Sequence, residues 1–111
     1  MTDITLLEKI TAINEGLRTA FGEDGSPFEI ATRLLEEAGE LAAEINHFED
    51  SGVKRAKHGE PDRMALAKEV QDVIRCALQV AYYYDLDAEL EASVEKSYQQ
   101  HLENVLTKRY D

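Results

Sequence analysis

The helical period of the apolar residues is the feature that most constrains the fold of this chain. Between residues 27 and 48, apolar side chains recur every three or four positions over about five helical turns. The same period occupies three further segments, at residues 3–21, 62–84 and 87–106. No stretch of the sequence shows the strict alternation of a half-buried strand, so we expect an all-α fold.

The starts of these segments carry residues that cap helices. Ser26 precedes Pro27, and Glu29 stands three residues after the serine, which predicts a capping box with proline at the first helical position. Stretches that contain glycine or proline interrupt the periodicity at residues 22–25 and 50–61 and predict joints between the helices. Aspartates at the other three starts are candidate N-caps: Asp3, Asp62 and Asp87.

A chain of 111 residues is expected to form one domain, residues 1–111, with a core that buries roughly two thirds of the surface exposed on unfolding. The single cysteine, Cys76, lies among apolar residues, cannot form an internal disulfide and is expected in that core. The start of the chain, MTDITLLEKI, lacks the basic residues and apolar run of a signal peptide, and no segment is apolar enough to span a bilayer. We therefore expect a cytoplasmic location without membrane contact.

Acidic residues outnumber basic residues along the whole chain. The 23 Asp and Glu against 12 Lys and Arg give a formal net charge of -11. Proteins that bind polymeric nucleic acid use basic surfaces that release counterions, so such a polymer is an unsuitable partner for this chain. A small phosphorylated substrate fits only if a divalent metal ion stands between its negative charge and that of the protein.

The stretch "LLEEAGELAAE" places carboxylates along the edge of an apolar helix face. Glu37 and Glu40 stand three residues apart in this stretch, and Glu69 and Asp72 repeat the spacing in "KEVQD". If the two helices pack antiparallel, as consecutive helices of a bundle usually do, both pairs can point into one cleft.

Four converging carboxylates need a cation or a proton between them. Two like charges about 4 Å apart repel by about 4 kcal/mol at an effective dielectric constant of about 20. A ligand set made only of carboxylates suits Mg²⁺ or Mn²⁺ and argues against zinc. We expect Gly39, a poor helix former between the acids, to let a ligand or a neighbouring chain approach closely. The alternative is an ordinary solvated surface, since acid clusters such as residues 87–95 arise by chance in so acidic a chain.

Two motifs taken together resemble those of a known family. "LLEEAGELAAEI" followed by "LAKEVQDVI" is similar to the paired ExxE and ExxD signature of the MazG-like all-α nucleoside triphosphate pyrophosphohydrolases. The resemblance covers the chain from about Pro27 to Asp72 and extends more loosely to "EKSYQQHLENVLTKRYD". It implies a four-helix MazG-like bundle that is completed by oligomerisation into a homodimer or homotetramer. A third helix as apolar as this one favours burial against a partner chain.

The resemblance also implies an activity and its residues. Members of this family use Mg²⁺ to cleave a nucleoside triphosphate between the α and β phosphates, which yields a nucleoside monophosphate and pyrophosphate. The role that this activity suggests is the removal of noncanonical or surplus deoxynucleotides. Glu36 is a candidate to orient or deprotonate the attacking water, with a solvated acid as the alternative. The positions that match the metal ligands of the family are Glu37, Glu40, Glu69 and Asp72.

Phosphate oxygens that the metal does not neutralise need basic side chains. For each of the basic residues named next, the alternative is an ordinary solvated position on the protein surface. The candidates in the last helix are Lys96, Lys108 and Arg109. The candidates in the loop between the second and third helices are Lys54, Arg55 and Lys57.

Two other functions stay open. One is the related phosphoribosyl-ATP pyrophosphohydrolase of histidine synthesis, although "EEAGEL" resembles the MazG form more closely. The other is a noncatalytic helical module whose acidic face binds a basic partner.

Overall fold

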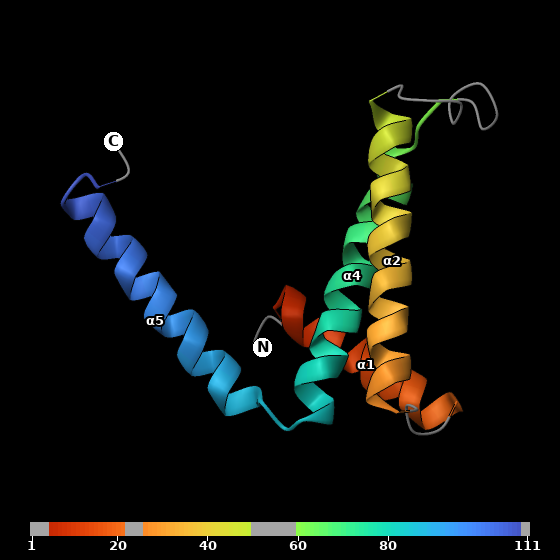
Figure 1. The fold of residues 1–111 in the computed structure, drawn as a ribbon, viewed down its shortest axis with the longest axis horizontal. Coiled ribbons are helices and arrows are strands. Elements are labelled where there is room, and N and C mark those ends of the chain that lie inside the picture. The colour runs from red at the N-terminus through yellow and green to blue at the C-terminus, as the bar shows by residue number, and fades with distance from the viewer. Residues whose placement is uncertain (1–4, 22–25, 50–59, 110–111) are drawn as a thin grey trace. The chain divides into compact units, whose positions relative to one another are not determined.

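The computed structural model describes residues 5–21, 26–49 and 60–109, with the backbone alone for residues 19–21. These ranges contain no strand, and none of their helices combines the length and the apolar character that a membrane span requires. The all-α prediction is therefore confirmed for them. The four helices are α1 (Leu6–Phe21), α2 (Pro27–Phe48), α4 (Arg63–Tyr83) and α5 (Asp87–Leu106) (Figure 1).

Side-chain caps mark the starts of α1, α2 and α4. The Ser26 hydroxyl accepts a hydrogen bond of 3.4 Å from the Glu29 N–H, as the capping motif predicts. Asp62 accepts one of 2.9 Å from the N–H two residues later, at the start of α4. At the start of α1 the Thr5 hydroxyl accepts one of 3.2 Å from the N–H three residues later. Asp3, the cap that the sequence favours for this helix, lies outside the described residues.

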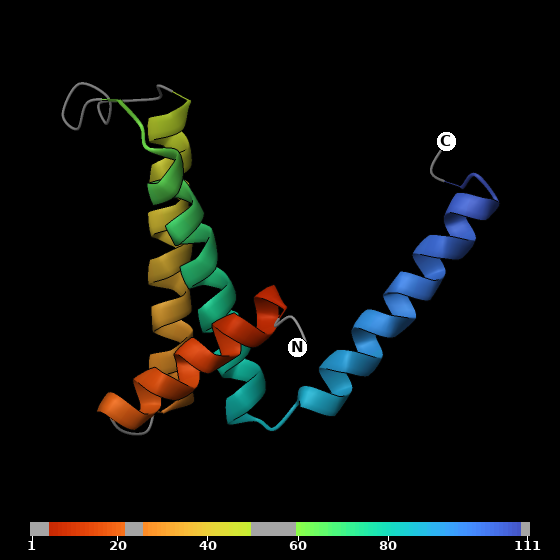
Figure 2. The same ribbon diagram turned by 180° about the vertical axis from the view of Figure 1, so that it is seen from behind.

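The chain divides into two compact units, unit 1 (Met1–Val80) and unit 2 (Ala81–Asp111). In unit 1, α2 and α4 lie side by side and run in opposite directions, and α1 crosses them near the start of α2 (Figures 1 and 2). Each of these helices contributes a buried apolar side chain: Ile10, Ile30 and Cys76. Cys76 is 0% exposed, which confirms its predicted place in the core.

A tight turn within unit 2 ends α4 and leads into α5. Asp85 has a φ of 54°, in the left-handed region that glycine adopts more easily. The N–H of the next residue, Leu86, donates to the Ala81 carbonyl oxygen at 2.8 Å, and the Asp85 N–H donates to the Tyr82 carbonyl oxygen at 3.1 Å. This pair of hydrogen bonds is a Schellman motif, which satisfies carbonyl groups at the end of α4.

The same turn corrects the prediction that Asp87 caps α5. The N-cap is Leu86, which makes no side-chain capping hydrogen bond, and Asp87 is the first residue of the helix. The reason is that the Schellman turn brings the chain directly into the helix one residue earlier than the aspartate. Asp87 still contributes, because a negative charge in the first turn interacts favourably with the helix dipole.

α5 carries an apolar line that unit 2 does not bury. None of the side chains of this helix is buried. The described part of unit 2 holds only the last turn of α4 beside this helix, so the apolar line stays exposed. Its large apolar residues are Leu90, Val94, Tyr98, Leu102 and Val105.

Candidate metal centre

Three of the four predicted metal ligands meet between α2 and α4. Glu37 comes from α2, and Glu69 and Asp72 come from one face of α4. Each offers one carboxylate oxygen, and these three oxygens all lie within 4.8 Å of one another. We call these residues the acidic trio. The matched spacing in the sequence and the antiparallel packing of the two helices therefore bring acids together as predicted.

Glu69 is the member of the acidic trio with a buried carboxylate oxygen, Oε2, that makes no hydrogen bond to the described residues. Burial raises the pKa of Glu69 above its ordinary value of 4.5, and the charges of Glu37 and Asp72 raise it further, followed by those of Glu40 and Glu44. Every cause named for the shift thus disfavours the charged form of this carboxyl group.

Asp72 differs from Glu69 because two basic side chains of α4 approach it. Lys68 Nζ lies 2.7 Å from Asp72 Oδ1, and Arg75 Nε lies 3.7 Å from the same oxygen atom. The spacing of four and three residues places both cations beside Asp72 on the helix surface. The sequence carries this signal, as a Lys and an Arg at helical spacing around the acid, although neither residue is among the predicted phosphate-binding cations.

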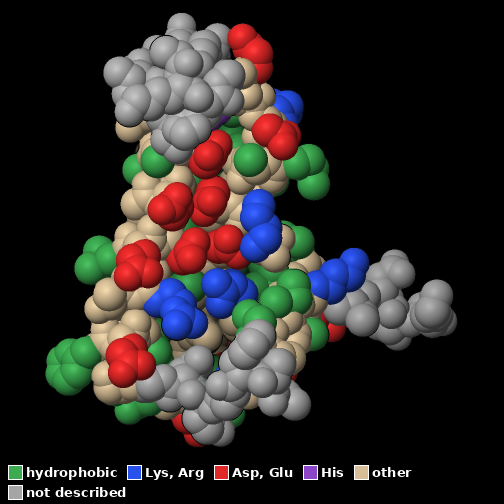
Figure 3. All heavy atoms as spheres, turned by 90° about the vertical axis from the view of Figure 1, so that its right-hand side faces the viewer, with side chains coloured by type: hydrophobic (Ala, Val, Ile, Leu, Met, Phe, Trp, Pro, Cys, Tyr) green, Lys and Arg blue, Asp and Glu red, His purple; other side chains and the backbone are tan. Residues whose placement is uncertain are grey.

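The fourth predicted ligand, Glu40, is exposed and does not belong to the acidic trio, although its charge acts on Glu69. One turn further along α2, Glu44 Oε2 lies 3.9 Å from Nδ1 of the buried His47. On the face of the molecule that Figure 3 shows, Asp and Glu side chains gather in the middle, with Lys and Arg side chains next to them. The charges of Glu40 and Glu44 both act on Glu69, so the acidic trio has further acidic neighbours along α2.

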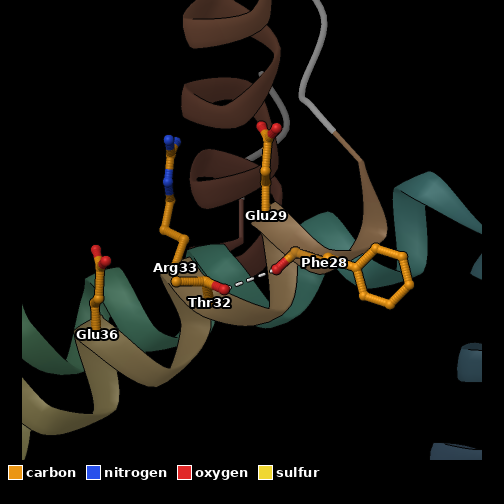
Figure 4. A pocket seen from close by; sticks show the side chains of 5 residues that line it. All are labelled: Phe28, Glu29, Thr32, Arg33 and Glu36. Atoms are coloured by element: carbon orange, nitrogen blue, oxygen red, sulfur yellow. Dashed lines mark hydrogen bonds between the residues drawn. The ribbon is translucent and has the colours of Figure 1, made fainter.

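Glu36 lies outside the acidic trio, in an open pocket of about 320 Å³ along α2 (Figure 4). Arg33 is the one basic residue among the five that line the pocket, and its side chain extends to the same side of the helix as Glu29 (Figure 4). Phe28 is 81% exposed at the other end of the pocket. Arg33 precedes Glu37 by one helical turn, so the pocket and the trio are neighbours along α2. Sequence reasoning did not identify Arg33.

The predicted basic residues of the last helix all fall in unit 2, and all are exposed. Lys96 lies within α5, whereas Lys108 and Arg109 follow its last residue, Leu106. Lys108 has a φ of 59° and occupies the left-handed position that ends the helix. The loop candidates Lys54, Arg55 and Lys57 lie outside the described residues.

The chain matches no family model, and comparisons with curated proteins and with solved structures find no significant match.

The donor set of the acidic trio suits a hard divalent cation. Its donors are carboxylate oxygens, without the histidine or cysteine that zinc sites use. Among the described residues the buried Oε2 atom of Glu69 has no hydrogen-bond partner, which is uncommon for a buried polar atom, and a metal ion would supply one. Mg²⁺ in enzymes of phosphate chemistry is typically held by few carboxylates, with water and substrate oxygens in the remaining positions.

Proposed function

We propose that this protein is a Mg²⁺-dependent nucleoside triphosphate pyrophosphohydrolase of the MazG-like type. It cleaves a ribo- or deoxyribonucleoside triphosphate between the α and β phosphates and releases the nucleoside monophosphate and pyrophosphate. The observation that carries this proposal is the meeting of Glu37, Glu69 and Asp72 within 4.8 Å, from two helices whose motifs resemble the ExxE and ExxD signature. A role in removing noncanonical or surplus deoxynucleotides is consistent with this activity.

The acidic trio would hold the metal ion, with Glu40 as the fourth ligand and Mn²⁺ as a possible substitute for Mg²⁺. When bound, such an ion stabilises negative charge on the phosphate oxygens and orients the attacking water. The raised pKa of Glu69, caused by burial and by its acidic neighbours, supports this role, because a cation relieves the same repulsion that favours protonation.

The chemistry assigned to this chain is a displacement at the α-phosphorus atom. A water oxygen forms a bond to the α-phosphorus, the bond from that phosphorus to the bridging oxygen breaks, and pyrophosphate leaves with the electron pair. Glu36 accepts the proton of the water as general base. Its exposed carboxylate in the pocket beside Arg33 supports the assignment, since substrate and solvent can both reach it.

Basic side chains would bind the phosphate groups that face away from the metal. Lys96, Lys108 and Arg109 keep this role in the proposal because they lie in the segment that resembles the tail of the family. Arg33 joins them as a cation of unit 1, one helical turn before Glu37.

The proposal includes assembly into a homodimer or homotetramer. It is supported by the apolar line of α5, which unit 2 does not bury. Large apolar side chains of unit 1 are exposed as well: Leu6, Leu7, Ile13, Leu35, Ile45 and Val70. Exposed apolar area of this kind is typical of a surface that another chain covers. Light scattering coupled to size-exclusion chromatography measures the assembly directly, and a monomer would contradict this part of the proposal.

The test of the activity is a panel of nucleoside triphosphates incubated with the purified protein in Mg²⁺ or in EDTA, with pyrophosphate release as the readout. We expect pyrophosphate release in the samples with Mg²⁺ and none in those with EDTA. Asp72→Asn and Glu40→Gln should reduce it at least about 100-fold, while the control Glu91→Gln, on the exposed surface of α5, should not change it. Equal release by wild type and Asp72→Asn would contradict the proposal.

The same panel separates the alternatives. Phosphoribosyl-ATP as the one substrate turned over would assign the chain to histidine synthesis. The acidic surface on the face shown in Figure 3 is the observation that favours a noncatalytic module, because a basic partner could bind there. That module predicts no turnover of any nucleotide with any metal.

A further inference from the structure

Lys68 and Arg75 approach the same oxygen atom of Asp72 but differ in their freedom to move. The Lys68 side chain is 60% exposed, whereas that of Arg75 is 12% exposed. An exposed lysine on a flexible stem can change its partner at little cost, and its ion pair contributes at most about 1 kcal/mol. A largely buried arginine is held in one place by the side chains around it. The two cations beside Asp72 are therefore suited to different tasks.

A divalent cation in the acidic trio would compete with Lys68 for Asp72. The Lys68 ammonium group already contacts Asp72 Oδ1 at 2.7 Å, which is the distance of a short charge-assisted hydrogen bond. A metal ion would bind the same negatively charged carboxylate, and two cations that share one carboxylate repel each other. Binding of the metal should thus weaken the hold of Asp72 on Lys68.

The polyphosphate of a substrate offers the displaced ammonium group a new partner. The proposed reaction brings phosphate oxygens to the metal, so they arrive within one side-chain length of Asp72. Lysine binds phosphate as a flexible point charge, and hydrogen bonds between charged groups are stronger than neutral ones. Lys68 starts from the correct position, because it stands one helical turn from Asp72 and next to Glu69 in the sequence.

We infer that Lys68 exchanges its partner when substrate binds, from the Asp72 carboxylate to the polyphosphate, while Arg75 remains and holds Asp72 in place. Lys68 is then a substrate-binding residue and Arg75 a positioning residue. The inference rests on the proposed function, because it requires a metal ion in the trio and a phosphorylated substrate.

The exchange predicts effects of opposite sign in two binding measurements. Lys68→Met removes the charge and keeps most of the apolar stem. Without the competing cation, Mn²⁺ titrated into the protein should bind about two- to fivefold more tightly, as expected for loss of an exposed ion pair. Pyrophosphate titrated into the Mn²⁺-saturated protein should bind about tenfold or more weakly, because a charge-assisted hydrogen bond is lost. Isothermal titration calorimetry measures both affinities without turnover.

Two controls accompany this variant. Lys68→Arg keeps the positive charge at an exposed position and should stay within about twofold of wild type in both titrations. Lys9→Met removes the same charge from the exposed surface of α1, which supplies no residue of the trio, and should also leave both affinities within about twofold. Circular dichroism confirms the fold of each variant.

The outcomes separate this inference from the proposed function. If wild type binds Mn²⁺ and Lys68→Met binds it no more tightly, or binds pyrophosphate as well as wild type does, the exchange is wrong while the metal site stands. If wild type and Glu69→Gln bind Mn²⁺ equally weakly, the metal site itself is wrong, and the exchange is overturned with it. Tighter Mn²⁺ binding together with weaker pyrophosphate binding supports the exchange.

Discussion

The side-chain amide of Asn14 donates a hydrogen bond of 3.0 Å to the carbonyl oxygen of Arg75 and so joins α1 to α4. Asn14 is 4% exposed, and its Oδ1 atom has no partner among the described residues. Arg75 in turn directs its Nε atom toward Asp72 at 3.7 Å. The packing of α1 thereby reaches the helix that supplies two members of the acidic trio.

Replacement of Asn14 tests how much this contact stabilises unit 1. Asn14→Ala removes the hydrogen bond and buried volume, so we expect the free energy of unfolding to fall by about 1–2 kcal/mol. Asn14→Met fills the space and removes the unpaired oxygen atom, so its cost should be smaller. Urea denaturation measures both. Equal losses for the two variants would show that packing volume has no part in the effect.

A second prediction concerns the pH dependence of stability through Glu69. Its pKa in the folded protein lies above the ordinary value of 4.5, because of burial first and of its acidic neighbours second. Between pH 4.5 and the raised pKa of the folded state, the folded chain keeps a proton on Glu69 that the unfolded chain has released. The contribution of Glu69 to stability therefore falls as pH rises through this window and stays unfavourable above it. Below pH 4.5 the contribution is no longer unfavourable.

Glu69→Gln should remove this dependence. In EDTA at pH 7 the variant is expected to be more stable than wild type, and the difference should shrink as the pH falls toward 4.5. The same variant should lose Mn²⁺ binding, which is the usual exchange of function for stability at a strained site. Thermal denaturation across this pH range is the measurement, with Glu91→Gln as the control. A variant less stable than wild type at neutral pH would sink the prediction.

Cys76 provides a third prediction. Burial raises the pKa of its thiol, and the charges of Glu37 and Asp72 act in the same direction, against those of Arg75 and Arg33. Because the thiolate is the reactive form and the side chain is 0% exposed, a thiol reagent should label the native protein slowly. Labelling in denaturant should be faster by about three orders of magnitude or more, in line with the stability of a small domain. Rapid labelling of the native protein would contradict the burial of Cys76.

Local features of the fold could be predicted from the sequence because they depend on neighbouring residues. The cap at Ser26 and the cap at Asp62 each involve an N–H group within three residues, so the motif alone specifies them. Cys76 was placed in the core by the apolar residues around it in the helix. The wrong cap at Asp87 shows the limit of such reasoning, because the left-handed conformation of Asp85 moves the helix start by one residue.

The candidate site could be predicted only in part, because its geometry depends on how two helices pack. Spacing identified Glu37, Glu69 and Asp72, which share the contact between α2 and α4. Spacing could not show that Glu40, with the same motif signal, stays exposed, since this depends on the relative rotation of the two helices. The sequence did contain Lys68 at four residues from Asp72, a pair that helical geometry alone brings together.

The turn between α4 and α5 gives a fourth prediction. Asp85→Gly removes the steric cost of a φ of 54° and should raise the free energy of unfolding by about 0.5–1 kcal/mol. The matched substitution Asp87→Gly, inside the first turn of α5, should lower it by a similar amount, because glycine is a poor helix former and a favourable charge is lost. Thermal unfolding followed by circular dichroism compares the two. Shifts of the same sign would contradict the Schellman turn.

The last prediction uses two glycines that stand within helices. Gly39 lies on α2 between the acids and Gly16 lies on α1. A Cβ atom built at either position meets no described atom within 4 Å apart from the neighbouring residues and backbone of its own helix. Alanine is the better helix former, so Gly39→Ala and Gly16→Ala should each raise the free energy of unfolding by up to about 1 kcal/mol.

Activity should distinguish these two variants. If Gly39 serves close approach of a ligand, as its position among the acids suggests, Gly39→Ala should raise KM for the triphosphate while Gly16→Ala leaves it unchanged. The measurement is steady-state pyrophosphate release together with urea denaturation of both variants. Gains in stability without any change in KM would show that Gly39 is an ordinary surface glycine without a part in substrate binding.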